Sequence, residues 1–309
     1  MKNLIAATYA PMHPNGTLNL GIIKAYGEFL KSNKVTGAFV NGSTGDFVSL
    51  STSERMDLTE AWSDAKADDL YIINHVGHTN IREAKDLAVH SVGRANAIAA
   101  LAPYYYKPKC IERLLDYCME IASAAPDLPF YYYHIPVLSG VNFDMVTFQN
   151  KAISSIPNFR GIKFTEDNLT GFASSLDYSD DKVEIFFGVD EKFASSIKVG
   201  AKGWVGSTYN HLAPLYHSIL TNHDNGLIEN ADKLQKLAVY FVDTLEEIGG
   251  FHGGSKGFMK FFGLEMGPSR FPHKTFSDIQ LNQAYDLMKK ESLLDYLSKP
   301  TQLSKIPNQ

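Results

Sequence analysis

Short apolar runs alternate with longer amphipathic segments over the first two thirds of the chain. The runs are rich in β-branched and aromatic side chains, which favours buried strands, and polar or glycine-containing segments separate them. They predict eight strands, at residues 4–9, 37–41, 71–76, 97–102, 129–133, 159–164, 183–188 and 203–206. The eighth run is the shortest of them.

Helix-start signals lie in the segments between these runs. Ser51 and Glu54 have the spacing of a capping box, which predicts a helix continuing to about Lys66. Asn80 with Glu83 three residues later predicts a second helix start. Each predicted helix therefore follows a predicted strand, as in βα units.

Pro108 suits the first turn of a further helix, which we expect to end near Ala124. With it, eight strand–helix alternations fill about 210 residues, the size of one α/β barrel. The fold class predicted is therefore α/β, a (β/α)8 TIM barrel rather than a doubly wound open sheet.

The pattern changes after Asn210, where no further strand is predicted. Helical periodicity marks residues 213–221, 229–248, 256–262 and 278–297, with breaks at 224–226 and in the glycine-rich stretch 249–254. We therefore expect residues 1–222 to form the barrel and residues 223–309 to form a C-terminal helical appendage.

Composition restricts the class of protein. The chain has 309 residues, of which 44% are hydrophobic and 20% charged, enough for a sizeable core. A net charge of −5 argues against binding a phosphate backbone. Cys110 and Cys118 are the only cysteines, so no disulfide framework is expected, and we interpret both as small buried groups on one helix face.

The N-terminus resembles the start of a signal peptide, but Pro11 and Pro14 end its apolar run too early. No stretch approaches the roughly 20 apolar residues that cross a membrane. We therefore expect a cytoplasmic protein.

Lys163 is the most informative candidate residue, because it falls inside the apolar run 159–164. A lysine buried there would have a lowered pKa, and a neutral amine is a nucleophile toward carbonyl carbon. The alternative from this run alone is a lysine at a strand end that points to solvent.

Residues 42–46, Gly-Ser-Thr-Gly-Asp, follow the second predicted strand. Ser43 and Thr44 lie between two glycines, so their hydroxyl and N–H groups could turn toward an anion such as a carboxylate. An ordinary tight turn is the alternative.

Three more strand ends carry polar side chains, and the last of them is residues 206–210, Gly-Ser-Thr-Tyr-Asn, which combines a glycine with hydrogen-bonding side chains. Tyr133 could move protons, whereas Tyr131 and Tyr132 are interpreted as core residues. Asp190 and Glu191 could accept hydrogen bonds from sugar hydroxyls, or they could simply begin a helix.

The carboxyl ends of barrel strands meet at one mouth, so these side chains would surround Lys163 there. An amine, a phenol and an anion-binding turn suit carbon–carbon chemistry through an imine of an α-keto acid.

Two other motifs could indicate a metal site or a phosphate loop, but neither has the required pattern. His75 and His78 have no third ligand at a suggestive spacing, and we interpret them as loop residues. Residues 253–256, Gly-Gly-Ser-Lys, have Ser and Lys in the wrong order for a phosphate loop.

Five motifs together resemble the dihydrodipicolinate synthase and N-acetylneuraminate lyase superfamily over nearly the whole chain. They are GSTGD at 42–46, YHIP at 133–136, GIKFT at 161–165, GVDE at 188–191 and GSTYN at 206–210. By this resemblance Lys163 would form a Schiff base with pyruvate and Tyr133 would shuttle protons. Ser43 and Thr44 would hold the pyruvate carboxylate, and Tyr105 would be supplied across a subunit interface.

The resemblance also bears on the substrate. The synthase branch has an arginine two residues after the proline of its YNVP motif, where this chain has Leu138, which cannot bind a carboxylate. The lyase branch instead has the pattern I-P-x-L-S/T-G, with Asp-Glu after the seventh strand and Gly-Ser-Thr-Tyr-Asn after the eighth, and this chain has all three. By resemblance the sugar contacts would come from Thr165, Gly188, Asp190, Glu191 and Ser207. Asp46 stands where many members have glutamate, and Phe251 is expected near the mouth.

The resemblance therefore implies a metal-free and cofactor-free Schiff-base aldolase acting on N-acetylneuraminate, a small-molecule substrate, as a homotetramer. Another pyruvate-dependent aldolase or dehydratase of the superfamily is the first alternative. The second is a ligand-binding protein without activity, which would be expected to lack the lysine or the tyrosine.

Overall fold

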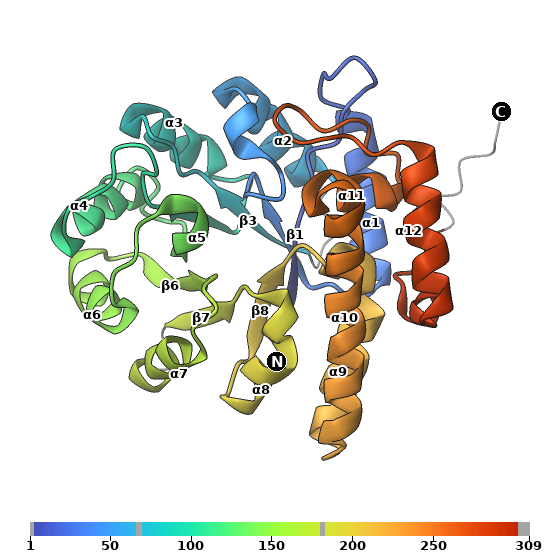
Figure 1. The fold of residues 1–309 in the computed structure, drawn as a ribbon. Coiled ribbons are helices and arrows are strands. Elements are labelled where there is room, and N and C mark those ends of the chain that lie inside the picture. Colours follow the sequence, from blue (N-terminus) through green and yellow to red (C-terminus); the bar gives the residue numbers. More distant parts are fainter. Residues whose placement is uncertain (1–2, 66–69, 180–182, 302–309) are drawn as a thin grey trace.

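Eight parallel strands close into a barrel in the computed structural model of the chain, which describes residues 3–65, 70–179 and 183–301 (Figure 1). Each strand pairs with the next along the chain, and β8 closes on β1. The strands are β1 (Asn3–Ala7), β2 (Gly37–Val40), β3 (Tyr71–His75), β4 (Ala97–Leu101), β5 (Phe130–His134), β6 (Phe159–Phe164), β7 (Glu184–Phe187) and β8 (Gly203–Gly206). The predicted TIM barrel and its eight strands are confirmed.

Helices surround the barrel on its outside (Figure 1). They are α1 (Ile23–Ser32), α2 (Thr52–Asp64), α3 (Ile81–Ser91), α4 (Ile111–Ala122), the short α5 (Pro136–Ser139), α6 (Met145–Ser155), α7 (Leu169–Tyr178) and α8 (Phe193–Lys198). The predicted capping box at Ser51 is present, with both of its hydrogen bonds. The predicted end of that helix, Lys66, lies outside the described residues.

Two predictions about α4 are wrong. The helix begins at Ile111, so Pro108 lies before its N-cap and not in its first turn. Cys110 is that N-cap residue and is exposed, whereas Cys118 is buried on the inner face of the helix. The two cysteines therefore do not share a buried face, because the helix starts after the first of them.

The C-terminal helices pack beside α1 and the β1–β8 side of the barrel (Figure 1). They are α9 (Tyr209–Asp224), α10 (Ile228–Gly249), α11 (Phe251–Phe258) and α12 (Asp278–Lys290). Helix α9 continues past residue 222, where we expected the barrel to end. The division of the chain into a barrel and a helical appendage stays a prediction. No described helix is long and apolar enough to cross a membrane.

The predicted break over residues 249–254 is wrong for most of its length. Only Gly250, with φ of 113°, interrupts the helices, and α11 begins at Phe251. A Cβ on Gly253 would lie 1.8 Å from the carbonyl oxygen of Lys274, and one on Gly254 would lie 2.8 Å from the ring of Phe276. These glycines allow close packing inside a helix.

The last helix is also shorter than the predicted range 278–297. It ends at Lys290, and Ser292 follows in a left-handed conformation with φ of 58°. A short 3₁₀ turn, Leu293–Tyr296, continues the chain. Helical periodicity persists through this turn, which explains why the sequence alone overestimated the helix.

Successive side chains of a strand point to opposite faces of the sheet. The core therefore has two layers, one inside the barrel and one between the strands and the helices. Tyr132 of β5 lies in the layer between strands and helices, where its ring packs 4.5 Å from that of Phe148. Tyr131 and Tyr133 lie inside the barrel. Tyr131 and Tyr132 are therefore core residues, as predicted.

Candidate active site

Lys163 faces the barrel interior, because Ile162 and Phe164 on either side of it belong to the outer core layer. In the sheet it lies level with Tyr133 of β5 and Phe186 of β7. Its exposed fraction is only 4%, which excludes the alternative of a lysine that points to solvent.

The environment of the Lys163 amine is apolar and aromatic. Its Nζ lies 3.9 Å from the ring centroid of Tyr133 and 4.2 Å from that of Phe39. It donates a hydrogen bond to no residue that the structure describes. Burial lowers its pKa to about 7, against a smaller opposing effect of the Asp190 carboxylate. A large fraction of the amine is therefore neutral near pH 7, as a nucleophile requires.

Tyr133 connects this amine to the predicted anion turn. Its hydroxyl lies 3.4 Å from Oγ of Ser43. Burial raises the pKa of Tyr133 to about 12, although the hydroxyl of Ser43 opposes that rise. The phenol therefore keeps its proton at neutral pH and can give or pass it to a group bound beside Lys163.

The turn after β2 presents free donors. In the part of the chain that the structure describes, the backbone N–H groups of Ser43 and Thr44 donate to no acceptor. The turn is tight: a Cβ on Gly45 would lie 3.1 Å from the carbonyl oxygen of Thr8. Unpaired N–H groups beside two hydroxyls fit a carboxylate, and this favours an anion-binding turn over an ordinary one.

Polar groups also gather after β6, β7 and β8. Asp190 is buried and accepts hydrogen bonds from the N–H of Thr208, at 2.9 Å, and from its hydroxyl, at 2.7 Å. Its other oxygen, Oδ1, has no partner among the described residues. A Cβ on Gly206 would lie 1.7 Å from that oxygen, so only glycine leaves room for this carboxylate.

Gly188 plays the same part for Thr165, because a Cβ there would lie 2.1 Å from the Thr165 hydroxyl oxygen. That oxygen is buried and also lacks a partner in the described structure. Glu191 follows in a 3₁₀ turn (Asp190–Lys192), where burial raises the pKa of its carboxyl. Thr165 and Asp190 thus offer a hydroxyl and a carboxylate oxygen that lack partners among the described residues, as is needed to bind the hydroxyls of a substrate.

A cavity of about 380 Å³ opens over these strand ends. Its lining residues are Tyr9, Ser43, Thr44, Asp46, Phe47, Val48, Leu101, Tyr104, Leu138, Ser139, Ser207, Phe251, His252, Ser255 and His273. Lys163 and Tyr133 are outside that set, but the Ser43 hydroxyl joins Tyr133 to the cavity. Phe251 reaches the cavity, as predicted.

Not every predicted site residue lines the cavity. Thr165, Gly188, Asp190 and Glu191 do not line it. Tyr105 is 75% exposed, and its ring packs on that of Tyr106 with centroids 4.9 Å apart; its neighbour Tyr104 lines the cavity instead. In the single chain Tyr105 is therefore outside the site, and its role across a subunit interface stays a prediction.

Sequence reasoning missed several residues of this region. His75 was interpreted as a loop residue, but it is the last residue of β3 and is buried, with Nδ1 2.8 Å from the carbonyl oxygen of Asn41. Tyr9, His252 and His273 line the cavity from three segments far apart in sequence. No local pattern could have joined these segments.

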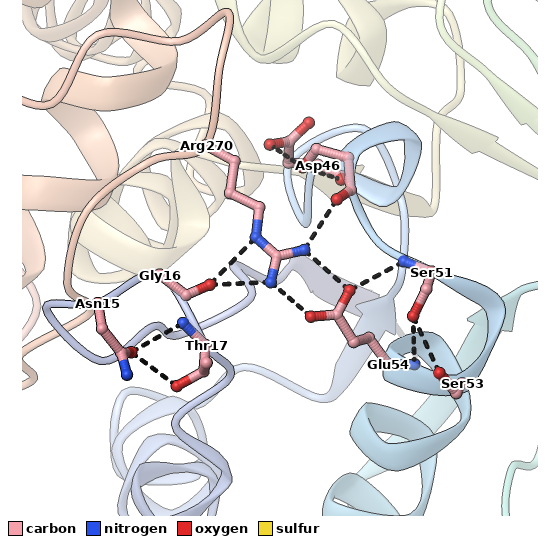
Figure 2. A network of polar contacts seen from close by, with 9 residues as sticks. Asn15, Gly16, Thr17, Asp46, Ser51, Ser53, Glu54 and Arg270 are labelled. Carbon is pink, nitrogen blue, oxygen red and sulfur yellow. Dashed lines mark hydrogen bonds and ion pairs between the residues drawn. The ribbon is translucent and has the colours of Figure 1, made fainter.

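Arg270 fixes the segment that carries His273. Figure 2 shows its guanidinium between Glu54 at the start of α2 and the carbonyl oxygen of Gly16. Its Nη1 donates to Oε2 of Glu54 at 2.8 Å, and its Nη2 donates to the Gly16 oxygen at 2.8 Å. This contact holds the pKa of Glu54 at about 2. The C-terminal region is thereby attached to the loops above β1 and β2.

The chain is similar to known proteins over nearly its whole length. The model of the "Dihydrodipicolinate synthetase family" matches residues 1–291. N-acetylneuraminate lyase A of Xenopus laevis is 36% identical over 96% of this chain and 98% of its own length. Human N-acetylneuraminate lyase is 36% identical over 96% and 94%. The solved structure of Proteus mirabilis N-acetylneuraminate lyase superposes with a TM-score of 0.90 and 32% identity, covering 94% of this chain and 98% of that one.

Proposed function

Because the chain belongs to the dihydrodipicolinate synthetase family, we propose that it is a class I aldolase that reversibly cleaves N-acetylneuraminate to N-acetyl-D-mannosamine and pyruvate. The observation that carries the proposal is the buried amine of Lys163, whose pKa is lowered to about 7 beside Tyr133. The relatives named N-acetylneuraminate lyase support the substrate.

In the first step the neutral Lys163 amine attacks the C2 keto carbon of the open-chain sugar. Water leaves, and a protonated imine remains between Nζ and C2. The free N–H groups and hydroxyls of Ser43 and Thr44 hold the substrate carboxylate next to that carbon. Positioning by this turn brings the keto group to the amine in the orientation needed for attack.

In the second step the proton of the C4 hydroxyl is removed and the C3–C4 bond breaks. Its electrons flow into the imine and leave an enamine on Lys163. Tyr133 acts here with Ser43, to which its hydroxyl is already close, by passing the C4 proton through the substrate carboxylate. Protonation of the enamine and hydrolysis of the imine then release pyruvate and restore the amine.

Leu138 supports a lyase rather than a synthase. It lines the cavity and offers no charge to a second carboxylate, as an arginine would. Thr165, Asp190 and Ser207 offer hydrogen-bonding groups for the sugar portion, together with Glu191 and the backbone of Gly188. The Asp190 and Thr165 oxygens that lack partners support this assignment.

A substrate panel tests the proposal. Pyruvate release is measured from N-acetylneuraminate and from 2-keto-3-deoxy sugar acids, with Lys163→Ala as the inactive control. We expect N-acetylneuraminate to give the highest kcat/KM. A higher kcat/KM for the other sugar acids would favour the alternative, another pyruvate-dependent aldolase of the superfamily.

The same proposal includes a homotetramer in the cytoplasm. Tyr105 and Tyr106 are 75% and 87% exposed, an unusual state for two adjacent aromatic rings, and a partner subunit could cover them. Analytical ultracentrifugation of the wild type and of Tyr105→Ala would measure the assembly. A monomeric wild type would exclude the contribution of Tyr105 to a neighbouring site.

A further inference from the structure

Three potential metal ligands meet on the wall of the cavity. Asp46 comes from the turn after β2, His252 from α11, and His273 from the irregular segment 263–277 before α12. One ligand atom from each side chain lies within 4.8 Å of the other two. No other such group of three occurs among the residues that the structure describes.

Asp46 has an oxygen available for a ligand. The residue is 7% exposed, and its Oδ1 is buried without a hydrogen-bond partner in the described structure. Its Oδ2 accepts a hydrogen bond from the hydroxyl of Ser49. Nε2 of His273 lies 3.9 Å from Oδ1, beyond hydrogen-bond distance. A buried carboxylate oxygen left in this state is costly unless something binds it.

The cations nearby form no hydrogen bond with Asp46 in the described structure. Lys256 donates to the carbonyl oxygen of Pro268 at 2.7 Å. Arg270 donates to Glu54, Gly16 and Ser49, and Figure 2 shows its guanidinium directed at Glu54 and Gly16. The open side of Asp46 therefore faces the two histidines.

We propose that Asp46, His252 and His273 bind a divalent transition metal of the zinc class, through one carboxylate oxygen and two imidazole nitrogens. One carboxylate and two imidazoles are a usual ligand set for Zn²⁺, with a fourth position left to water or a ligand. That position would open into the cavity that Ser43 and Thr44 also line. The metal takes no part in the Schiff-base steps.

The geometry needs only a local adjustment. Bonds of about 2.0–2.1 Å in a tetrahedral site place ligand atoms roughly 3.3 Å apart, so the side chains must close by at most about 1.5 Å. The two imidazole rings now stack, with centroids 3.8 Å apart, and one of them must turn to direct its nitrogen at the metal. The ring that turns would be that of His273, because its side chain is 35% exposed.

Metal binding to the chelator-stripped full-length chain tests the proposal. Zn²⁺ is titrated calorimetrically, without substrate, into the wild type, His273→Gln and His252→Phe. The phenylalanine keeps an aromatic ring against His273 and Tyr9. His13→Gln is the matched control, since His13 is exposed and outside the group of three.

We expect one Zn²⁺ per wild-type chain and in His13→Gln, with at least tenfold weaker binding in each of the other variants. Bound Co²⁺ should show the strong visible absorption of a tetrahedral site, and only in the proteins that bind Zn²⁺. Thermal melts without metal check that the variants are folded. Absence of a stoichiometric site in the wild type, or equal affinity in folded His273→Gln, would overturn the proposal. Pyruvate release with chelator present tests the aldolase separately.

Discussion

Two lysines of this chain are equally buried, yet their surroundings give them different roles. Lys163 on β6 and Lys256 on α11 are each 4% exposed, and burial lowers their pKa values to about 7 and about 8. Lys256 donates to the carbonyl oxygen of Pro268 at 2.7 Å. Lys163 donates to no described residue and faces two aromatic rings.

The difference shows that a lowered pKa alone does not identify a nucleophile. The hydrogen bond of Lys256 connects α11 to the segment that leads to α12, which is a structural task. The amine of Lys163 is available, and it lies next to a phenol that reaches the anion turn. Availability together with suitable neighbours distinguishes the reactive amine from the structural one.

Substitution of the two lysines should separate them most strongly. We expect Lys163→Met to lower kcat at least about a thousandfold, because the covalent route is lost. Lys256→Met should lower it less than about tenfold, since Lys256 bonds to no reacting group. Steady-state pyruvate release measures both. Equal losses in the two folded variants would contradict the distinction.

Tyr133 and Tyr131 offer a matched pair on β5, because both rings lie inside the barrel but their hydroxyls have different partners. The hydroxyl of Tyr133 lies near Ser43, whereas that of Tyr131 donates to Glu184. Tyr133→Phe should lower kcat about a hundredfold or more, the usual value of general acid–base catalysis. Tyr131→Phe should change kcat by less than about fivefold, and a larger loss would mean that the assignment of the proton carrier is wrong.

The pH profile should reflect Lys163. Its pKa in the folded chain is about 7, below the ordinary 10.5, so the neutral form is lost as the pH falls through 7. We therefore expect kcat/KM to be level above that pH and to fall about tenfold per unit below it. The carboxylate of Asp190 raises the pKa of Lys163, so Asp190→Asn should move this limb to lower pH. A shift to higher pH would contradict the cause assigned here.

The free energy of unfolding should show the smallest difference between the two lysines. A buried lysine with a lowered pKa destabilises the fold at neutral pH, because the unfolded chain binds its proton more tightly. That cost grows as the pH falls from about 10.5 to about 7 and is constant below. Lys163→Met should therefore raise the free energy of unfolding by about 4 kcal/mol at pH 7, because each unit of the shift from 10.5 to about 7 corresponds to roughly 1.4 kcal/mol. Lys256→Met should gain less, because it loses the bond to Pro268. Urea unfolding measures both changes.

The barrel could be predicted because its determinants are local. Each strand is an apolar run between polar segments, and Ser51 with Glu54 marks a helix start through contacts within four residues. The predictions failed where a distant residue decides the local structure. Gly253 and Gly254 lie inside a helix, where they allow the close approach of Lys274 and Phe276 from a later segment.

The site could be predicted in part for the same reason. The register that places Lys163 beside Tyr133 follows from consecutive strands, so both could be assigned to one mouth from the sequence. Asp46, His252 and His273 meet only because the C-terminal region folds back over β2. No spacing along the chain encodes that contact.

Reductive trapping tests the central claim most directly. The wild type is treated with borohydride in the presence of pyruvate, digested, and mapped by mass spectrometry. The proposed mechanism predicts one reduced pyruvate adduct per chain, on Lys163, with Lys256 unmodified. An adduct on Lys256, or a Lys163 that remains unmodified while activity persists, would contradict it.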